Sequence, residues 1–66
     1  MMTIEEVRQA VQAVKDKSDD AEVAHGAEDA LHQNVLDEIA NGNPNAVELA
    51  REALKTIDLN FARWCA

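Results

Sequence analysis

With 66 residues and a single cysteine, the chain is long enough for one small domain and cannot form an internal disulfide. Its net charge of −7 argues against direct binding to nucleic acid, whose phosphate backbone attracts Lys and Arg. The sequence contains neither the roughly 20 consecutive apolar residues of a membrane span nor the features of a signal peptide. Together with the unpaired cysteine, this pattern predicts a cytoplasmic protein without membrane contact.

The apolar part of the composition is made largely of alanine, so the sequence predicts a thin core between closely packed helices. A domain of this size gains a net stability of only ~3–5 kcal/mol from a single core unless something else holds it together. Neither a disulfide nor a zinc-finger spacing of Cys and His is present in the sequence. Self-association into a homodimer or larger oligomer is therefore the natural candidate for extra burial.

The first helix is predicted to begin after Thr3, whose hydroxyl can cap it while Glu6 completes a capping box. One apolar stripe follows at helical spacing: Ile4, Val7, Ala10, Val11 and Val14. This stripe can cover another helix, and it contains no residue that suggests chemistry.

The longest helix is predicted within Asp19 to Asn41, with Ser18, Asp19 or Asp20 as its cap and a left-handed end at Asn41 and Gly42. Its core face consists of small residues followed by large ones: Ala24, Ala27, Leu31, Val35 and Ile39. Gly26 is unfavourable inside a helix. Because alanines flank it, we expect another helix to approach closely there; the alternatives are a bend in the helix or a helix that begins only after Gly26.

A third helix is predicted after the turn at residues 41–45, capped by Asn43 ahead of Pro44 or by Asn45. It should end near Ile57, with these residues facing inward: Val47, Ala50, Ala53, Leu54 and Ile57. Asp58 could cap a short last helix through Ala66, with Phe61, Trp64 and Cys65 on one side. The predicted fold is all-α, a single domain over residues 1–66 made of three helices and a short C-terminal helix.

Two acid and histidine pairs recur with the same spacing, Glu22 with His25 and Asp29 with His32. Carboxylates and imidazoles three residues apart on an inward face are how helical bundles hold metal ions. The other helices offer no ligands on their inner faces, so only a symmetric oligomer could complete such a site. The simpler interpretation is that both histidines are structural and pair with their own acids. We expect no cofactor.

Glu28 falls within the apolar arc of the second helix, where a carboxylate needs a hydrogen-bond donor or a cation. The sequence offers these donors: His25, His32, Arg51, Arg63 and the indole of Trp64. No nucleophile, glycine loop or paired acid accompanies Glu28, so the sequence predicts a protein that is not an enzyme.

The negative charge is concentrated in the middle of the chain. Eight acidic residues and no Lys or Arg lie between Ser18 and Ala50. We expect part of this set to bind a basic surface of a protein partner: Asp19, Asp20, Glu22, Asp29, Asp37 and Glu38. Two alternatives are a metal-binding oligomer that uses His25 and His32, and a DNA mimic that occupies a nucleic-acid-binding groove.

Four short segments carry a resemblance to known proteins: residues 24–32 (AHGAEDALH), 35–36 (VL), 39–42 (IANG) and 61–64 (FARW). Over about two thirds of its length the chain resembles small helical proteins of actinobacteria and their phages. The resemblance implies a bacterial or phage setting, and no activity or catalytic residue. It also singles out His25, Glu28, Asp29 and Arg63, for which a network joining the second helix to the C-terminal segment is the simplest physical reason.

Overall fold

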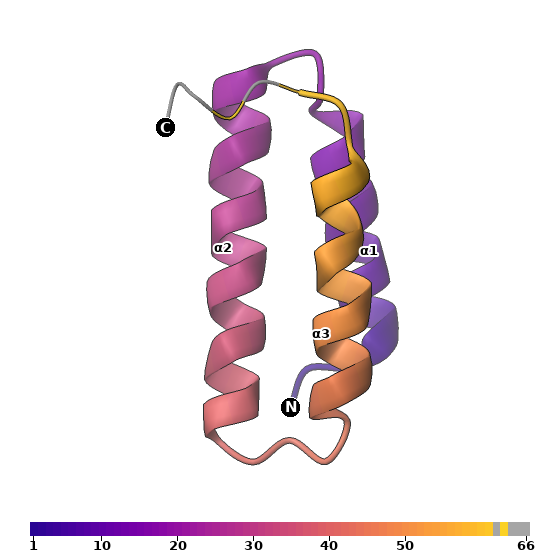
Figure 1. The fold of residues 1–66 in the computed structure, drawn as a ribbon, viewed down its shortest axis with the longest axis vertical. Helices are drawn as coiled ribbons and strands as arrows, with labels where there is room; N and C mark the ends of the chain where they lie inside the picture. Colours follow the sequence, from indigo (N-terminus) through magenta and orange to yellow (C-terminus); the bar gives the residue numbers. More distant parts are fainter. Residues whose placement is uncertain (62, 64–66) are drawn as a thin grey trace.

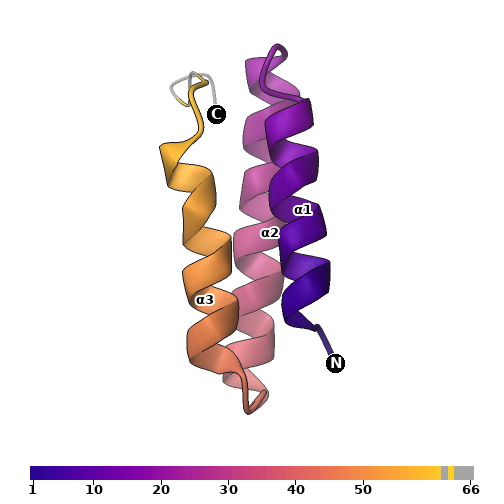
Figure 2. The same cartoon turned by 90° about the vertical axis from the view of Figure 1, so that its right-hand side faces the viewer.

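Three helices form the protein in a computed structural model that describes residues 1–61 and 63. They are α1 (Ile4–Asp16), α2 (Ala21–Ala40) and α3 (Ala46–Leu54), and the 3₁₀ turn η1 (Lys55–Asp58) continues directly from α3. Each helix packs against the other two, and α2 runs antiparallel to α1 and α3 (Figures 1 and 2). The all-α prediction is confirmed. Among the described residues, no helix has the length and hydrophobicity that a bilayer span requires.

The ends of α1 and α2 follow the predicted capping signals. Thr3 Oγ1 accepts from the Glu6 amide at 3.1 Å, and Glu6 Oε1 accepts from the Thr3 amide at 3.0 Å, which completes the capping box. Asp20 caps α2 by accepting from the Val23 amide at 3.2 Å. At the other end α2 closes through Gly42, whose φ of +81° is the left-handed conformation expected there.

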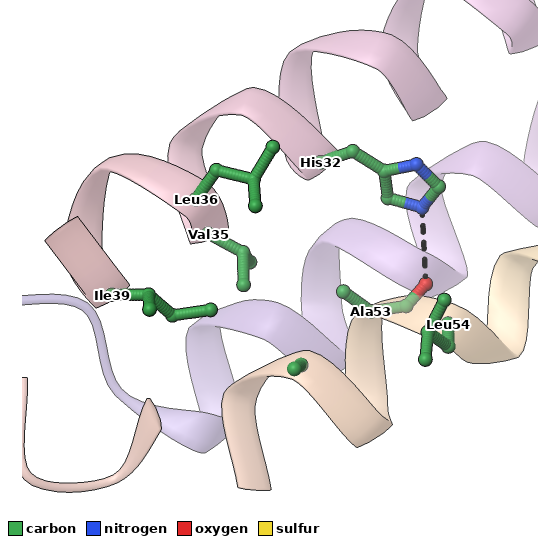
Figure 3. Close-up of a pocket in the computed structure, with 7 residues that line it drawn as sticks. His32, Val35, Leu36, Ile39, Ala53 and Leu54 are labelled. Carbon is green, nitrogen blue, oxygen red and sulfur yellow. Dashed lines mark hydrogen bonds between the residues drawn. The ribbon is translucent and has the colours of Figure 1, made fainter. Parts of the chain in front are cut away.

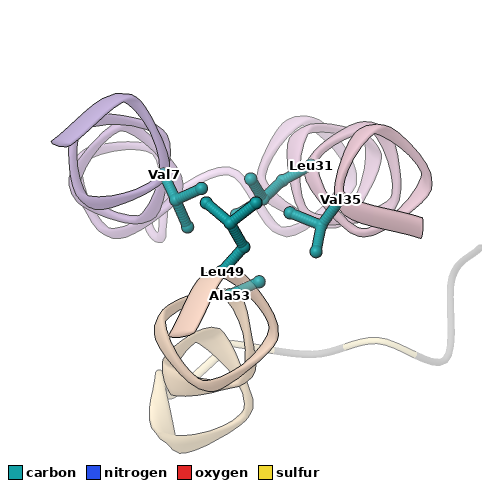
Figure 4. Close-up of a cluster of buried hydrophobic side chains, with 5 residues drawn as sticks. All are labelled: Val7, Leu31, Val35, Leu49 and Ala53. Carbon is teal, nitrogen blue, oxygen red and sulfur yellow. The ribbon is translucent and has the colours of Figure 1, made fainter. Parts of the chain in front are cut away.

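A small apolar cluster joins the three helices at the centre of the molecule. Its buried members are drawn in Figure 4: Val7, Leu31, Val35, Leu49 and Ala53. Val14 and Ala24 are buried as well, near the turn between α1 and α2. Ile39, predicted in the core face of α2, lies instead at its margin with 37 % of its surface exposed.

The prediction of a close helix approach at Gly26 is wrong. α2 is continuous through this residue, and a Cβ added there would meet nothing within 4 Å. Gly26 is exposed on the outer side of the helix. The alanines beside it do not create a contact because only Ala24 of the group points into the core.

Asn43 organises the turn between α2 and α3. Its side chain is buried, with Oδ1 accepting from the Asn45 amide at 2.8 Å and Nδ2 donating to the Met2 carbonyl at 3.1 Å. The regular helix begins only at Ala46, and Asn45 makes no side-chain capping bond. Of the two predicted caps, only Asn43 uses its side chain as a cap. It caps the turn that precedes α3 and not α3 itself.

The predicted inward face of α3 is confirmed at Ala53 but is wrong for its large residues. Leu49, Ala53 and Thr56 are buried, whereas Val47, Leu54 and Ile57 have between 55 % and 61 % of their surface exposed. The Thr56 hydroxyl donates to the Ala53 carbonyl at 3.1 Å and also lies 2.9 Å from the His32 ring. These hydrogen bonds satisfy the Thr56 hydroxyl in the core. The stripe that contains Thr56 can therefore be buried, although it looks less apolar in the sequence than the predicted stripe.

The predicted helix from Asp58 to the C-terminus is also wrong over the described residues. Asp58 ends η1, Leu59 is extended with a ψ of 138°, and neither Phe61 nor Arg63 is helical. The chain leaves the helix axis because the Arg63 side chain is bound by α2, as described below. Trp64 and Cys65, predicted on one side of that helix, lie outside the described residues.

The two glycines give a first test of the fold. We expect Gly26→Ala to raise the free energy of unfolding by about 0.5–1 kcal/mol, because the new methyl group is unobstructed and alanine favours the helix. Gly42→Ala should lower it by about 1 kcal/mol, because φ is positive there. Urea denaturation of both variants checks this. A loss of stability in Gly26→Ala would mean that something packs against the outer side of α2.

Candidate functional site

The carboxylate of Glu28 lies in the protein interior and is bound by the guanidinium of Arg63. Glu28 has 4 % of its surface exposed. Arg63 Nε donates to Oε1 at 2.8 Å, and an Arg63 terminal nitrogen donates to Oε2 at 3.1 Å. Both oxygens are occupied in the two-bond geometry that arginine and carboxylate favour. Of the donors that the sequence offered, the structure therefore places Arg63 at Glu28.

The same guanidinium fastens the C-terminal segment to the end of α3. It donates to the carbonyls of Thr56 at 2.7 Å, Leu59 at 3.3 Å and Phe61 at 3.4 Å. Its central carbon lies 4.0 Å from the centre of the Phe61 ring, so the cation stacks on the aromatic face. Arg63 thus joins α2, η1 and the segment that follows η1.

The charge state of this pair follows from competing effects. Burial alone raises the pKa of the Glu28 carboxyl, but the hydrogen bonds and positive charge of Arg63 outweigh it and hold that pKa below its usual value. The same hydrogen bonds raise the pKa of the Arg63 guanidinium. Glu28 is therefore ionised and bound at both oxygens. This arrangement suits a structural ion pair and leaves no free carboxylate to accept a proton from a substrate.

His32 contacts α3 rather than an acid of its own helix. Its Nε2 lies 2.9 Å from Thr56 Oγ1 and 3.3 Å from the Ala53 carbonyl, and Figure 3 draws the second of these contacts. Since a carbonyl oxygen can only accept, the contact with Ala53 requires a proton on Nε2. The predicted pairing of His32 with Asp29 is not what the structure shows.

His25 is paired with an acid, but not with the one predicted. Its Nε2 lies 3.5 Å from the Asp29 carboxylate, one helical turn further on, and not beside Glu22. The His25 side chain is 15 % exposed and that of Asp29 is 68 % exposed. The two histidines therefore point to different partners. Within residues 1–61 and 63, no three acidic, histidine or cysteine side chains come together in a way that could hold a metal ion.

The acidic residues predicted to bind a partner divide into two groups. Asp19, Glu22, Asp29 and Asp37 are exposed along the outer side of α2 and the turn before it. The carboxylate of Asp20 is used as the cap of α2. Glu38 is half-buried, and its carboxylate accepts from the Met2 amide and from Asn43 Nδ2.

The environment of Glu38 favours its charged form. The Met2 amide and then the Asn43 side chain hold the pKa of the Glu38 carboxyl below its usual value. Because Asn43 Nδ2 also donates to the Met2 carbonyl, these three residues tie the N-terminus to the turn after α2. Glu38 therefore helps to hold the fold together, and its predicted role in partner binding stays a prediction.

A shallow apolar groove of about 260 Å³, which the sequence pattern did not predict, runs between α2 and α3. Figure 3 shows its lining, with Val35, Leu36 and Ile39 from α2 facing residues of α3 and with His32 at one end. The α3 side consists of Ala50, Ala53 and Leu54. The groove was missed because Leu54 was assigned to the core. Leu36, a large apolar residue outside the predicted core arc, was the signal that could have revealed it.

The ion pair gives a second test. We expect Arg63→Gln to lower the free energy of unfolding by about 1–3 kcal/mol, because the buried Glu28 carboxylate then lacks its cation. Lys17→Gln, which removes an exposed positive charge from the turn after α1, should change it by less than about 0.5 kcal/mol. Urea denaturation of both variants at neutral pH measures this. Equal effects of the two variants would contradict a structural role for Arg63.

The lowered pKa of Glu28 also predicts how stability depends on pH. A carboxyl group whose pKa is lower in the folded than in the unfolded protein stabilises the folded state at any pH above the unfolded-state value. This stabilisation disappears as the pH falls through the folded-state value. The stability advantage of the wild type over Glu28→Gln should therefore be full above the ordinary value of 4.5 and shrink below it. Denaturation curves from about pH 6 to about pH 3 measure this difference. An advantage that grows on acidification would show that burial has raised the pKa instead.

Comparisons of this chain with protein-family models, with curated proteins and with solved structures gave no match. They do not bear on the resemblance to small actinobacterial and phage proteins, which stays a prediction. The function proposed below therefore depends on the geometry and charge of the chain itself.

Proposed function

We propose that the protein is a non-enzymatic interaction protein whose exposed acidic face binds a basic surface of a protein partner. We call this surface the acidic face and define it as Asp19, Glu22, Asp29 and Asp37. The observation that carries the proposal is the absence of any Lys or Arg between Ser18 and Ala50. Apart from the contact of Asp29 with His25, the described residues provide no cation for these four acids.

The contrast with α3 supports this proposal. The acid at the centre of the exposed ion pairs there, Glu52, contacts Lys55 at 2.8 Å and Arg8 at 3.1 Å. Lys55 first and then Arg8 lower the pKa of the Glu52 carboxyl, so that residue is neutralised within the molecule. The charges of the acidic face are not. They repel one another across α2, and a basic partner would relieve this repulsion while being steered toward the face.

Several features indicate a protein rather than a nucleic acid as the partner. The face would repel phosphates, and exposed carboxylates are the groups that Lys and Arg side chains of a partner bind. The setting we propose is the cytoplasm of a bacterium or an infecting phage, as the sequence resemblance implies. Binding of this kind weakens as salt shortens the range of the electrostatic attraction, which is about 8 Å at physiological ionic strength.

An affinity capture from actinobacterial lysate tests the proposal. The test variant neutralises part of the acidic face with near-isosteric residues: Glu22→Gln, Asp29→Asn and Asp37→Asn. The control variant removes the same charge from exposed positions elsewhere: Glu5→Gln, Glu48→Gln and Asp58→Asn. We expect wild type and control to retain the same partner, the test variant to lose it, and salt to release it. Equal capture by the test and control variants would contradict a specific role of the face.

The two alternatives from the sequence give different outcomes in the same preparation. A DNA mimic would capture a nucleic-acid-binding protein, and duplex DNA would compete with the capture. A metal-binding oligomer built on His25 and His32 would retain metal through purification and melt at a lower temperature with a chelator. The metal-binding alternative has less support, because His32 is bound to α3 and His25 to Asp29.

A further inference from the structure

The groove between α2 and α3 is lined by two exposed leucines and borders the acidic face at Asp29 and Asp37. Leu36 on α2 is 64 % exposed, and Leu54 on α3 is 55 % exposed. Val47 and Ile57, which are also more than half exposed, flank Leu54 along the same side of the chain. Each of these four side chains is larger than the two alanines that the fold buries. A groove lined by exposed leucines marks an interaction site.

The buried core is small in comparison. Seven apolar residues are buried in the described chain, and two of them are alanines. A domain of this size lies near the limit at which one core suffices, and no disulfide is available to it. Covering the groove would bury large side chains that the monomer leaves in water. A second copy of the chain is always present at the same concentration as the first. It is therefore the partner from which the chain gains most.

We propose that two copies of the chain pair through this groove, with α2 of each copy lying over α3 of the other. The arrangement has a two-fold axis parallel to the helices, so each copy presents the same surface. Leu36 and Leu54 of each copy then fill the groove of the other copy. The result is a four-helix layer, with α1 of each copy on the outside.

The charges beside the groove select this arrangement from the alternative with α2 on α2. Asp29 lies two turns before Leu36 on the same side of α2, and Asp37 directly follows Leu36. Placing α2 on α2 would oppose two acidic surfaces that have no basic residue. On α3, Arg51 follows Ala50 in the groove wall, is exposed and makes no ion pair with any described residue.

With α2 over α3, Arg51 of one copy comes to the edge of the contact near Asp37 of the other. The His32 contact with Ala53 aligns α2 and α3 along their length, and counting along both helices from this contact places Arg51 level with Asn34. Asp37 lies three residues, or about 4.5 Å, further along the axis, which is within the reach of an arginine side chain. The symmetry creates this contact twice. Asp19 and Glu22 lie at the far end of α2 and stay exposed, so the dimer leaves part of the acidic face to a partner.

Sedimentation equilibrium of the full chain tests the dimer. We expect a mass twice the 7.2 kDa of one chain, and a melting temperature that rises with protein concentration. Leu36→Asp and Leu54→Asp should each weaken the dimer about a hundred-fold, because each places a charge in the centre of an apolar contact. Val23→Asp is the matched control, because Val23 is 48 % exposed on α2 and does not line the groove. It should leave the dimer unchanged.

Charge exchange tests the arrangement and does not disturb apolar packing. Arg51→Asp and Asp37→Arg should each weaken the dimer by about five- to ten-fold, and the double variant should restore it. Circular dichroism of each variant confirms that the helices are intact. A wild-type chain that sediments as a monomer at its highest attainable concentration would overturn the proposal. A dimer that is weakened as much by Val23→Asp as by Leu36→Asp would overturn it too. A double variant in which dimerisation does not recover would overturn the placement of α2 over α3.

Discussion

The bound charge of Glu28 is the constraint on which the arrangement of the C-terminal part of the chain depends. A carboxylate with 4 % exposure needs a cation or hydrogen-bond donors to stay ionised, and α2 contains no Lys or Arg. Arg63 therefore has to reach back across 35 positions of sequence. In doing so it also binds three backbone carbonyls, so that one guanidinium fixes the path of the chain after α3.

A second polar contact holds the other end of the molecule. Glu38 and Asn43 bind the backbone of Met2, which joins the N-terminus to the turn between α2 and α3. The apolar cluster lies between these two polar contacts and contains few large side chains. The acids of α2 therefore serve two purposes. Glu28 and Glu38 face inward and determine where the chain ends lie, whereas Glu22, Asp29 and Asp37 face outward and give the surface its negative potential.

The parts of the fold that the sequence predicts depend on residues three or four positions apart. The capping box of Thr3 and Glu6, the cap at Asp20 and the end at Gly42 are of this kind. The orientation of α3 is different. Two apolar stripes overlap on that helix, and the choice between them depends on the anchored turn at Asn43 and on hydrogen bonds that allow Thr56 into the core. The helix predicted from Asp58 failed because a contact with Glu28 outweighed a local capping signal. Within the candidate site, the position of Glu28 in the apolar arc was enough to predict that it needs a cation. The partners of the two histidines could not be predicted from the sequence.

Because Arg63 joins α2 to the segment after η1, the interior is sensitive to one residue that lies outside the helices. Loss of Arg63 removes none of the apolar side chains that the structure describes as buried. It nevertheless leaves a negative charge in the interior without its cation, which destabilises the folded state as strongly as many substitutions in the core. Quality control that acts on unstable proteins would then discard chains that lack this one side chain, although all three helices lie before it in the sequence.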